Sequence, residues 1–196
     1  RLLDTAIGSV LSFMASYFLF PHWESNQLTS YMMSVLEANI SYLKKLTEII
    51  IGKLNSPLEY KLVRKDVFLS TANLSAAFNR MLSEPKNKQR SGREIYQFVV
   101  LNNVLSSNIA GLIPIVLNTE NFPHQKESLQ FIKRSIHNLE NSLLQMRETN
   151  ISTLERNRAD ETVPTLKQLD GQVFGQVDFI YNLTEKINKT TTSILM

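Results

Sequence analysis

Residues Arg1 to Glu24 read RLLDTAIGSVLSFMASYFLFPHWE, and this stretch decides what kind of protein the chain is. From Thr5 to Phe20 there is no charged side chain, and apolar residues occur on every side of a helix. A helix from Leu2 to Trp23 is roughly 33 Å long at about 1.5 Å per residue, enough to cross a hydrocarbon core of about 30 Å. The stretch therefore predicts a transmembrane helix at residues 1–23.

One face of this helix carries small or polar residues at every fourth position: Asp4, Gly8, Ser12 and Ser16. In lipid, the small residues Gly8, Ser12 and Ser16 let another helix approach closely, so they predict a helix-packing face. Asp4 should face neighbouring helices or water, because a charge is costly against lipid, and Arg1 lies within salt-bridge reach. We expect this pair either to have a function at the membrane edge or to anchor the helix end.

Two other interpretations of the first stretch were weighed. A buried core helix of a soluble protein has a similar length and composition. A secretion signal is disfavoured, because Asp4 interrupts the charge pattern and no small-residue cleavage site follows. The chain begins with Arg1 rather than methionine, so we expect it to be a fragment of a longer protein.

The composition argues against several classes of protein. The 196 residues include no cysteine, which excludes a disulfide scaffold and a thiolate metal site. The net charge of +3 is spread along the chain and does not predict nucleic-acid binding. The three histidines have no second ligand at metal spacing, and neither a phosphate-binding glycine loop nor a nucleophile elbow is present. We therefore expect no metal, no cofactor and no enzymatic activity.

The remainder of the chain predicts amphipathic helices and no strands. Apolar residues follow the helical period, and proline or polar segments interrupt it. The sequence therefore predicts an all-α fold, with one transmembrane helix at residues 1–23 and an antiparallel bundle of about five long helices in a domain at residues 24–196. The helices are expected at about 25–54, 57–84, 92–117 with a kink or an end at Pro114, 124–148, and from Pro164 onward.

Two of these helices have a more specific pattern. Residues 57–84 carry two apolar stripes, which predict contacts with neighbours on two sides. Residues 124–148 keep a strict 3-4-3-4-3 spacing, which is typical of coiled-coil packing. The first stripe is Val63, Val67, Leu74, Phe78 and Met81; the second is Leu58, Leu62, Leu69, Ala72 and Ala76; the heptad is Leu129, Ile132, Ile136, Leu139, Leu143 and Met146.

Short motifs occur in order along the first part of the chain. They are Arg1, Asp4, Thr5 and Gly8, then SYFLFPHWE at 16–24, ANISYL at 38–43, and RMLSEP at 80–85, with Arg80, Glu84 and Pro85, closing a helix that carries Arg64. In this combination they resemble the last membrane helix of the fusaric acid resistance (FUSC) family and the region that follows it. The remainder of the chain agrees with that family only in being helical.

The resemblance implies a multi-pass protein of the bacterial inner membrane, in which each membrane half is followed by a helical cytoplasmic region. Residues 1–23 would be the last helix of a membrane domain, and residues after Trp23 would be cytoplasmic. Relatives are linked to export of aromatic and other organic acids, which implies efflux with the helical domain supporting assembly or gating. Arg80 and Glu84 lie one turn apart and are expected either to pair and finish the helix or to dock onto the membrane domain.

Two functions from different classes follow. The first is a transporter component, with the lipid bilayer, upstream transmembrane helices of the same protein and a second copy of the chain as partners. The second is a helical interaction or sensor module, anchored by one helix and without transport activity. A soluble helical protein is a third interpretation. The basic segment Lys86 to Arg93 is interpreted as a solvated loop, and nucleic acid is not an expected partner.

Overall fold

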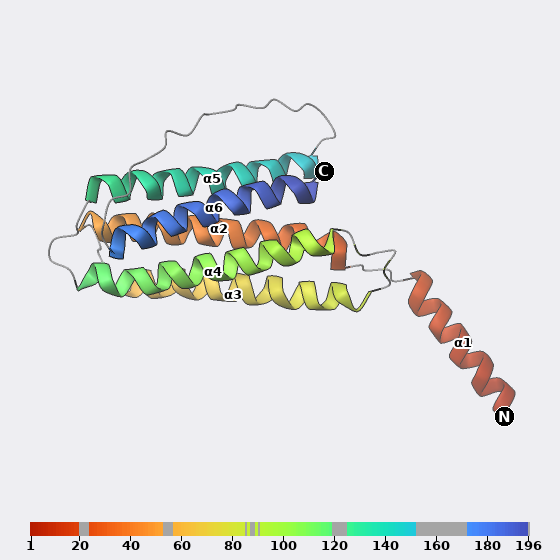
Figure 1. Ribbon diagram of the computed structural model, residues 1–196. Helices are drawn as coiled ribbons and strands as arrows, with labels where there is room; N and C mark the ends of the chain where they lie inside the picture. The colour runs from red at the N-terminus through yellow and green to blue at the C-terminus, as the bar shows by residue number, and fades with distance from the viewer. Residues whose placement is uncertain are drawn as a thin grey trace.

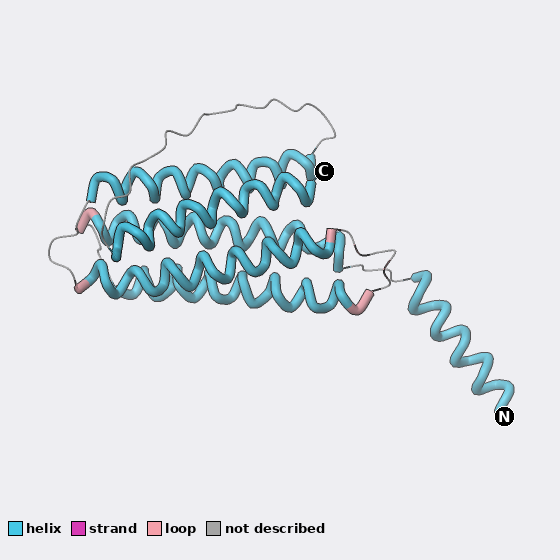
Figure 2. Tube along the Cα trace, in the orientation of Figure 1, coloured by secondary structure: helices cyan, strands magenta, loops and turns pink. Residues whose placement is uncertain are grey.

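A computed structural model describes residues 1–19, 24–52, 57–84, 86, 89, 91–118, 125–151 and 172–195. Every regular element in these ranges is a helix (Figures 1 and 2), which confirms the predicted all-α fold. In chain order the helices are α1 (Leu2–Leu19), α2 (Glu24–Ile50), α3 (Pro57–Leu82), α4 (Gly92–Leu117), α5 (Gln125–Ile151) and α6 (Gln172–Leu195). The expected start of the last helix at Pro164 lies outside the described residues.

Helix ends follow from local chemistry. Gly52, after the end of α2, has φ 77°, a left-handed conformation that glycine adopts without steric cost. Its N–H donates to the Ile49 carbonyl at 3.0 Å. Pro114 lies inside α4, which continues for less than one further turn to Leu117. Proline at this position removes only one amide hydrogen, so a helix that is about to end tolerates it.

The helices α2 to α5 run alternately up and down, whereas α6 runs parallel to α5 (Figure 1). Between α2 and α5, Glu37 pairs with Arg147 and Lys44 with Glu140, so numbers rise in one helix as they fall in the other. Between α5 and α6, three hydrogen bonds join residues that are 46, 46 and 47 positions apart. A nearly constant offset means that these two helices point the same way, which a short connection would not permit.

The predicted inward residues form one apolar core. Helix α2 is central, because it contacts α3, α4 and α5, while α6 closes the bundle against α4 and α5. Most of the predicted stripes are buried, including the first stripe of α3 from Val67 onward. The largest fully buried side chains are Tyr42, Phe98, Leu28, Met32, Leu36, Leu43, Leu46, Leu74, Met81, Leu105, Ile109 and Leu112.

The second stripe of α3 is exposed. Leu58, Leu62 and Leu69 are 63%, 52% and 54% exposed, and Ala72 and Ala76 are also exposed. The helix contacts two neighbours, α2 and α4, but both lie on the side of its buried stripe and leave Leu62 and Leu69 of the second stripe exposed. The stripe is therefore an apolar surface of the folded bundle.

Helix α1 projects from one end of the bundle and contacts none of the other helices (Figure 1). Its described side chains, from Leu2 to Met14, are all exposed, so no described part of the chain covers them. Among the described helices, α4 is long and apolar enough to cross a membrane. In its most apolar window, 44% is buried inside the protein. Leu2–Met14 of α1 is a shorter apolar segment. The buried side of α4 makes it a core helix, and spanning by α1 stays a prediction.

Candidate functional site

The predicted packing face of α1 has no protein neighbour among the described residues. A Cβ atom added at Gly8 would meet nothing within 4 Å, and Ser12 is exposed. The side chain of Ser16 lies outside the described residues. Asp4 is 3.7 Å from the backbone amino nitrogen of Arg1, whose guanidinium makes no described ion pair. Both side chains are exposed, and the role of the Arg1–Asp4 pair stays a prediction.

Two hydroxyl groups of α1 bond within the helix itself. Thr5 donates to the Arg1 carbonyl at 3.1 Å, and Ser9 donates to the Thr5 carbonyl at 2.8 Å. A hydroxyl satisfied by its own backbone needs no water, which lowers the cost of placing it in hydrocarbon. Helix α1 can therefore enter an apolar environment with Asp4 as its one ionised group between Leu2 and Leu19.

A buried polar cluster joins α2 to α4 in the core. The Asn39 amide donates to Asn102 Oδ1 at 3.0 Å, and the Ser106 hydroxyl donates to Asn39 Oδ1 at 3.0 Å. The Asn102 amide donates in turn to the Phe98 carbonyl at 2.9 Å. All three polar side chains are almost completely buried, so their mutual bonds fix the relative position of the two helices.

Tyr42 lies one turn after Asn39, in the same ANISYL motif. It is fully buried, and its ring stacks on that of Tyr60 with centroids 6.3 Å apart. Burial raises the pKa of the Tyr42 hydroxyl well above its usual range, and the neighbouring Tyr60 hydroxyl adds to this. Four residues of the motif, Asn39, Ile40, Tyr42 and Leu43, are buried, so the motif contributes to the packed core.

The interface of α5 and α6 is polar along one edge. Ser128, Ser135 and Ser142 recur every seven residues on α5 and are completely buried, and the Ser142 hydroxyl donates to Asn188 Oδ1 at 3.0 Å. In the predicted heptad, Ile132, Leu139, Leu143 and Met146 are buried, while Leu129 and Ile136 are half-buried against the core. The sequence analysis missed the serine column because it counted only apolar residues.

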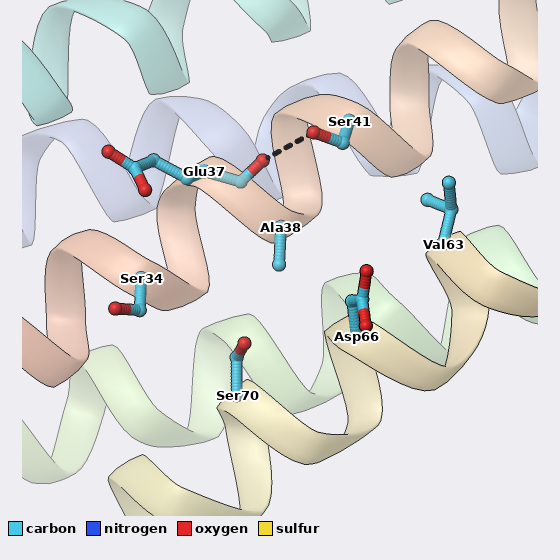
Figure 3. A pocket seen from close by; sticks show the side chains of 7 residues that line it. All are labelled: Ser34, Glu37, Ala38, Ser41, Val63, Asp66 and Ser70. Carbon is cyan, nitrogen blue, oxygen red and sulfur yellow. Dashed lines mark hydrogen bonds between the residues drawn. The ribbon is translucent and has the colours of Figure 1, made fainter.

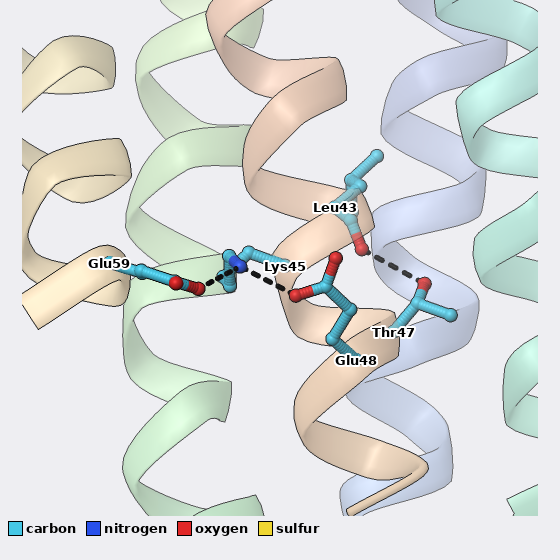
Figure 4. A network of polar contacts seen from close by, with 5 residues as sticks. All are labelled: Leu43, Lys45, Thr47, Glu48 and Glu59. Atoms are coloured by element: carbon cyan, nitrogen blue, oxygen red, sulfur yellow. Dashed lines mark hydrogen bonds and ion pairs between the residues drawn. The ribbon is translucent and has the colours of Figure 1, made fainter. Parts of the chain in front are cut away.

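Lys45 links α2 to the start of α3 (Figure 4). Its ammonium group bonds Glu48 of its own helix and Glu59 of α3, the latter at 2.9 Å. The side chain is only 13% exposed, so both pairs are partly shielded from water. The hydrogen bonds that Lys45 donates to Glu48 and Glu59 raise the pKa of Lys45 above its usual value. These groups stabilise a helix–helix contact and show no arrangement suited to proton transfer.

A shallow pocket of about 340 Å³ lies between α2 and α3 (Figure 3). Its lining includes the carboxyl-bearing residues Glu37 and Asp66, but Glu37 accepts a hydrogen bond from Arg147 of α5 at 2.6 Å. In the described part of the chain, no group of three His, Cys, Asp or Glu residues could hold a metal ion. The other residues that line the pocket are Ser34, Ala38, Ser41, Val63 and Ser70.

The family-like residues of α3 are spread along the helix. Arg64 is exposed, and its guanidinium lies 5.6 Å from the ring centre of Phe68. The Gln89 side-chain amide closes the helix end by donating to the carbonyls of Leu82 and Glu84 at 3.1 and 2.8 Å. Pairing of Arg80 with Glu84 stays a prediction, and Pro85 lies outside the described residues.

Comparison with known proteins connects the chain to membrane proteins. It is 27% identical over 112 residues to the inner membrane protein YccS of Escherichia coli (strain K12), covering 57% of the chain and 16% of YccS. It is 29% identical over 113 residues to an uncharacterized protein of Haemophilus influenzae, with the same two coverages. It is also 31% identical over 86 residues to an uncharacterized protein, ORF2, of Neisseria gonorrhoeae, covering 43% of the chain and 21% of that protein.

These similarities make the chain homologous, over about half its length, to an inner membrane protein. The aligned part is a small fraction of each relative, so the chain corresponds to a small part of them. No family model matches the chain, and no solved structure matches it.

Proposed function

We propose that this chain is the junction between membrane and cytoplasm in a multi-pass bacterial inner-membrane exporter. In this proposal α1 packs among other membrane helices, and α2 to α6 form a cytoplasmic domain that supports assembly or gating. The observation that carries the proposal is α1, whose described side chains are exposed and mostly apolar, and which contacts no other described helix. Such a surface is stable when lipid and neighbouring helices cover it.

The nature of the cargo follows only from the family resemblance, which implies aromatic or other organic acids. The bundle is proposed to support transport without binding cargo or catalysing a reaction. Its described core contains apolar side chains and hydrogen-bonded polar groups such as Asn39 and Asn102, and the α2–α3 pocket is shallow. Within α1, Asp4 marks the membrane edge, and the Gly8 face is proposed to meet another membrane helix.

The membrane position of α1 can be tested by cysteine accessibility in the complete protein. Two variants are made in a background without other cysteines. Val10→Cys lies on α1, and Lys133→Cys lies on the exposed surface of α5. A membrane-impermeant maleimide is added to intact, outer-membrane-permeabilised cells and to inverted inner-membrane vesicles. We expect Lys133→Cys to react only in the inverted vesicles, and Val10→Cys to stay unlabelled in both. Rapid labelling of Val10→Cys from water would refute the membrane assignment of α1.

Transport is tested separately, through the growth of cells exposed to fusaric acid or hydroxybenzoate. We expect loss of the complete protein to increase sensitivity, and Asp4→Asn, at a normal protein level, to increase it in part. Unchanged resistance in both strains, with α1 still protected from maleimide, would favour the anchored interaction module and reject export of these acids.

A further inference from the structure

The exposed stripe of α3 lies directly opposite its buried stripe. Around the helix axis, at 100° per residue, Leu62 and Leu69 lie within about 40° of one direction. Val67 and Leu74 lie near the opposite direction. The outer line continues at 4-3-4-3-4 spacing through Leu58, Leu62, Lys65, Leu69, Ala72 and Ala76, and all six residues are exposed. A heptad line on the outside of a folded bundle is the pattern of a helix that pairs with a second helix.

We propose that α3 pairs, in parallel, with α3 of a second copy of this chain. Charge on the two edges of the stripe supports this partner. Lys61 lies on one edge and Asp66 on the other, and both side chains are exposed. In a parallel two-helix contact, a residue on the first edge faces the residue five positions later on the partner's second edge. Lys61 of each copy therefore meets Asp66 of the other, and two-fold symmetry forms the pair twice.

Lys65 is the one charge within the stripe, and parallel pairing places it opposite Lys65 of the second copy, a like-charge contact that the neighbouring Asp66 carboxylates offset. Lys65 occupies a core position of the heptad, where its apolar stem packs and its ammonium group reaches the edge of the interface. There it lies beside Asp66 of the second copy. In an antiparallel pair centred on the same stripe, by contrast, the two Asp66 carboxylates face each other, and this like-charge contact disfavours that orientation.

The direction also agrees with where α1 leaves the bundle. Both copies of α1 extend from the same end of a parallel dimer, so both can enter one membrane, whereas an antiparallel dimer sends them to opposite ends (Figure 1). This step, unlike the heptad and the edge charges, rests on the proposed membrane function. Another segment of the complete protein is the competing partner for the exposed stripe. Pairing with such a segment would not require Lys61 and Asp66 to have opposite charges.

Disulfide trapping in native membranes tests the proposal, with the complete protein freed of other cysteines. Leu62→Cys and Ala76→Cys are made separately, and Lys133→Cys on α5 serves as an exposed control. Oxidation with copper phenanthroline should give covalent homodimers at both α3 positions and not at the control, because parallel pairing places equal residue numbers side by side. In an antiparallel pair centred on the stripe, near position 67, the cysteines at positions 62 and 76 lie about 15 Å and about 27 Å from their counterparts, too far for a disulfide.

Charge reversal then tests the register in the Ala76→Cys background. Lys61→Glu and Asp66→Lys, each alone, should reduce the cross-linked fraction several-fold, because each creates two like-charge contacts. The double variant Lys61→Glu/Asp66→Lys should restore the cross-linked fraction. Neither change should affect folding, because both residues are exposed on the bundle. The amount of each variant protein in the membrane checks that folding is unchanged.

Three results would overturn the proposal: no homodimer at either α3 position, trapping equal to that of the control, or no restoration by the double charge reversal. The first result would assign the stripe to another segment of the protein. The maleimide test at Val10 reports separately on the membrane function. Homodimers with an accessible Val10 would leave the α3 pairing intact and reject only the membrane role of α1.

Discussion

The buried cluster of Asn39, Asn102 and Ser106 allows a quantitative prediction. In Asn39→Leu, Asn102 Oδ1 loses the donor that lies 3.0 Å away, whereas the Ser106 hydroxyl keeps the Asn102 carbonyl at 2.8 Å. One orphaned buried acceptor costs about 1–3 kcal/mol, so we expect the free energy of unfolding to fall by about 2 kcal/mol. With an m-value of about 2 kcal/mol per molar urea, the midpoint should shift by about 1 M.

The assay is urea unfolding of the bundle alone, residues 24–196, followed by circular dichroism. Ser41→Ala is the control, since this exposed hydroxyl bonds only the Glu37 carbonyl of its own helix, and its removal should cost less than about 0.5 kcal/mol. In the double variant Asn39→Leu/Asn102→Leu no partner stays orphaned, so its loss should be smaller than the sum of the single losses. A stability of Asn39→Leu equal to wild type, or fully additive losses, would refute this reasoning.

Three further predictions concern the bundle. Residues 24–196 should fold without α1 into a helical, cooperatively unfolding protein, because α1 contacts none of the other helices; a non-cooperative thermal transition would contradict this. Ser135→Leu should destabilise the bundle by about 1–3 kcal/mol in urea, because it overfills the α5–α6 interface, whereas Lys133→Leu on the exposed side should not. Lys45→Met should lower stability near neutral pH, because Lys45 has a raised pKa in the folded state. The stabilisation by charged Lys45 is complete below the unfolded-state pKa of about 10.4 and is lost as pH rises through the folded-state pKa. The difference in free energy of unfolding between Lys45→Met and wild type should therefore shrink as pH rises through the folded-state pKa. A difference that does not change in urea titrations up to pH 11 would contradict this.

The positions of the helices were predictable because period and breaks are local properties of the sequence. The break between α2 and α3 was predicted at Asn55 to Pro57, and α3 begins at Pro57; α2 ends earlier than predicted, at Ile50, where the left-handed Gly52 follows. Apolar residues identify the inward face of each helix. The direction of α6 was not predictable. Its connection to α5 is long, and a long connection permits either direction, whereas the short ones between the earlier helices require reversal.

The polar interior was also hidden from the sequence analysis. Asn39, Asn102 and the serines of α5 belong to residue types that are mostly found on protein surfaces, and only their partners in space make them core residues. A column such as Ser128, Ser135 and Ser142 is visible as a seven-residue repeat, but only when small polar residues are counted with the apolar ones. The predicted face of α1 has no described neighbour, so its role stays a prediction.

The direction of α6 sets the sign of the electric field at the two ends of the bundle. Three helix C-termini, from α3, α5 and α6, and two N-termini, from α2 and α4, meet at the end next to α1. Each terminus carries about half an elementary charge, so this end has a net negative dipole charge of about one half, and the far end has the opposite sign. With α6 reversed, the signs would be exchanged. An anionic bilayer would therefore repel the backbone at this end, so attraction to it must come from basic side chains such as the exposed Lys86, between α3 and α4, and Arg93, in the first turn of α4.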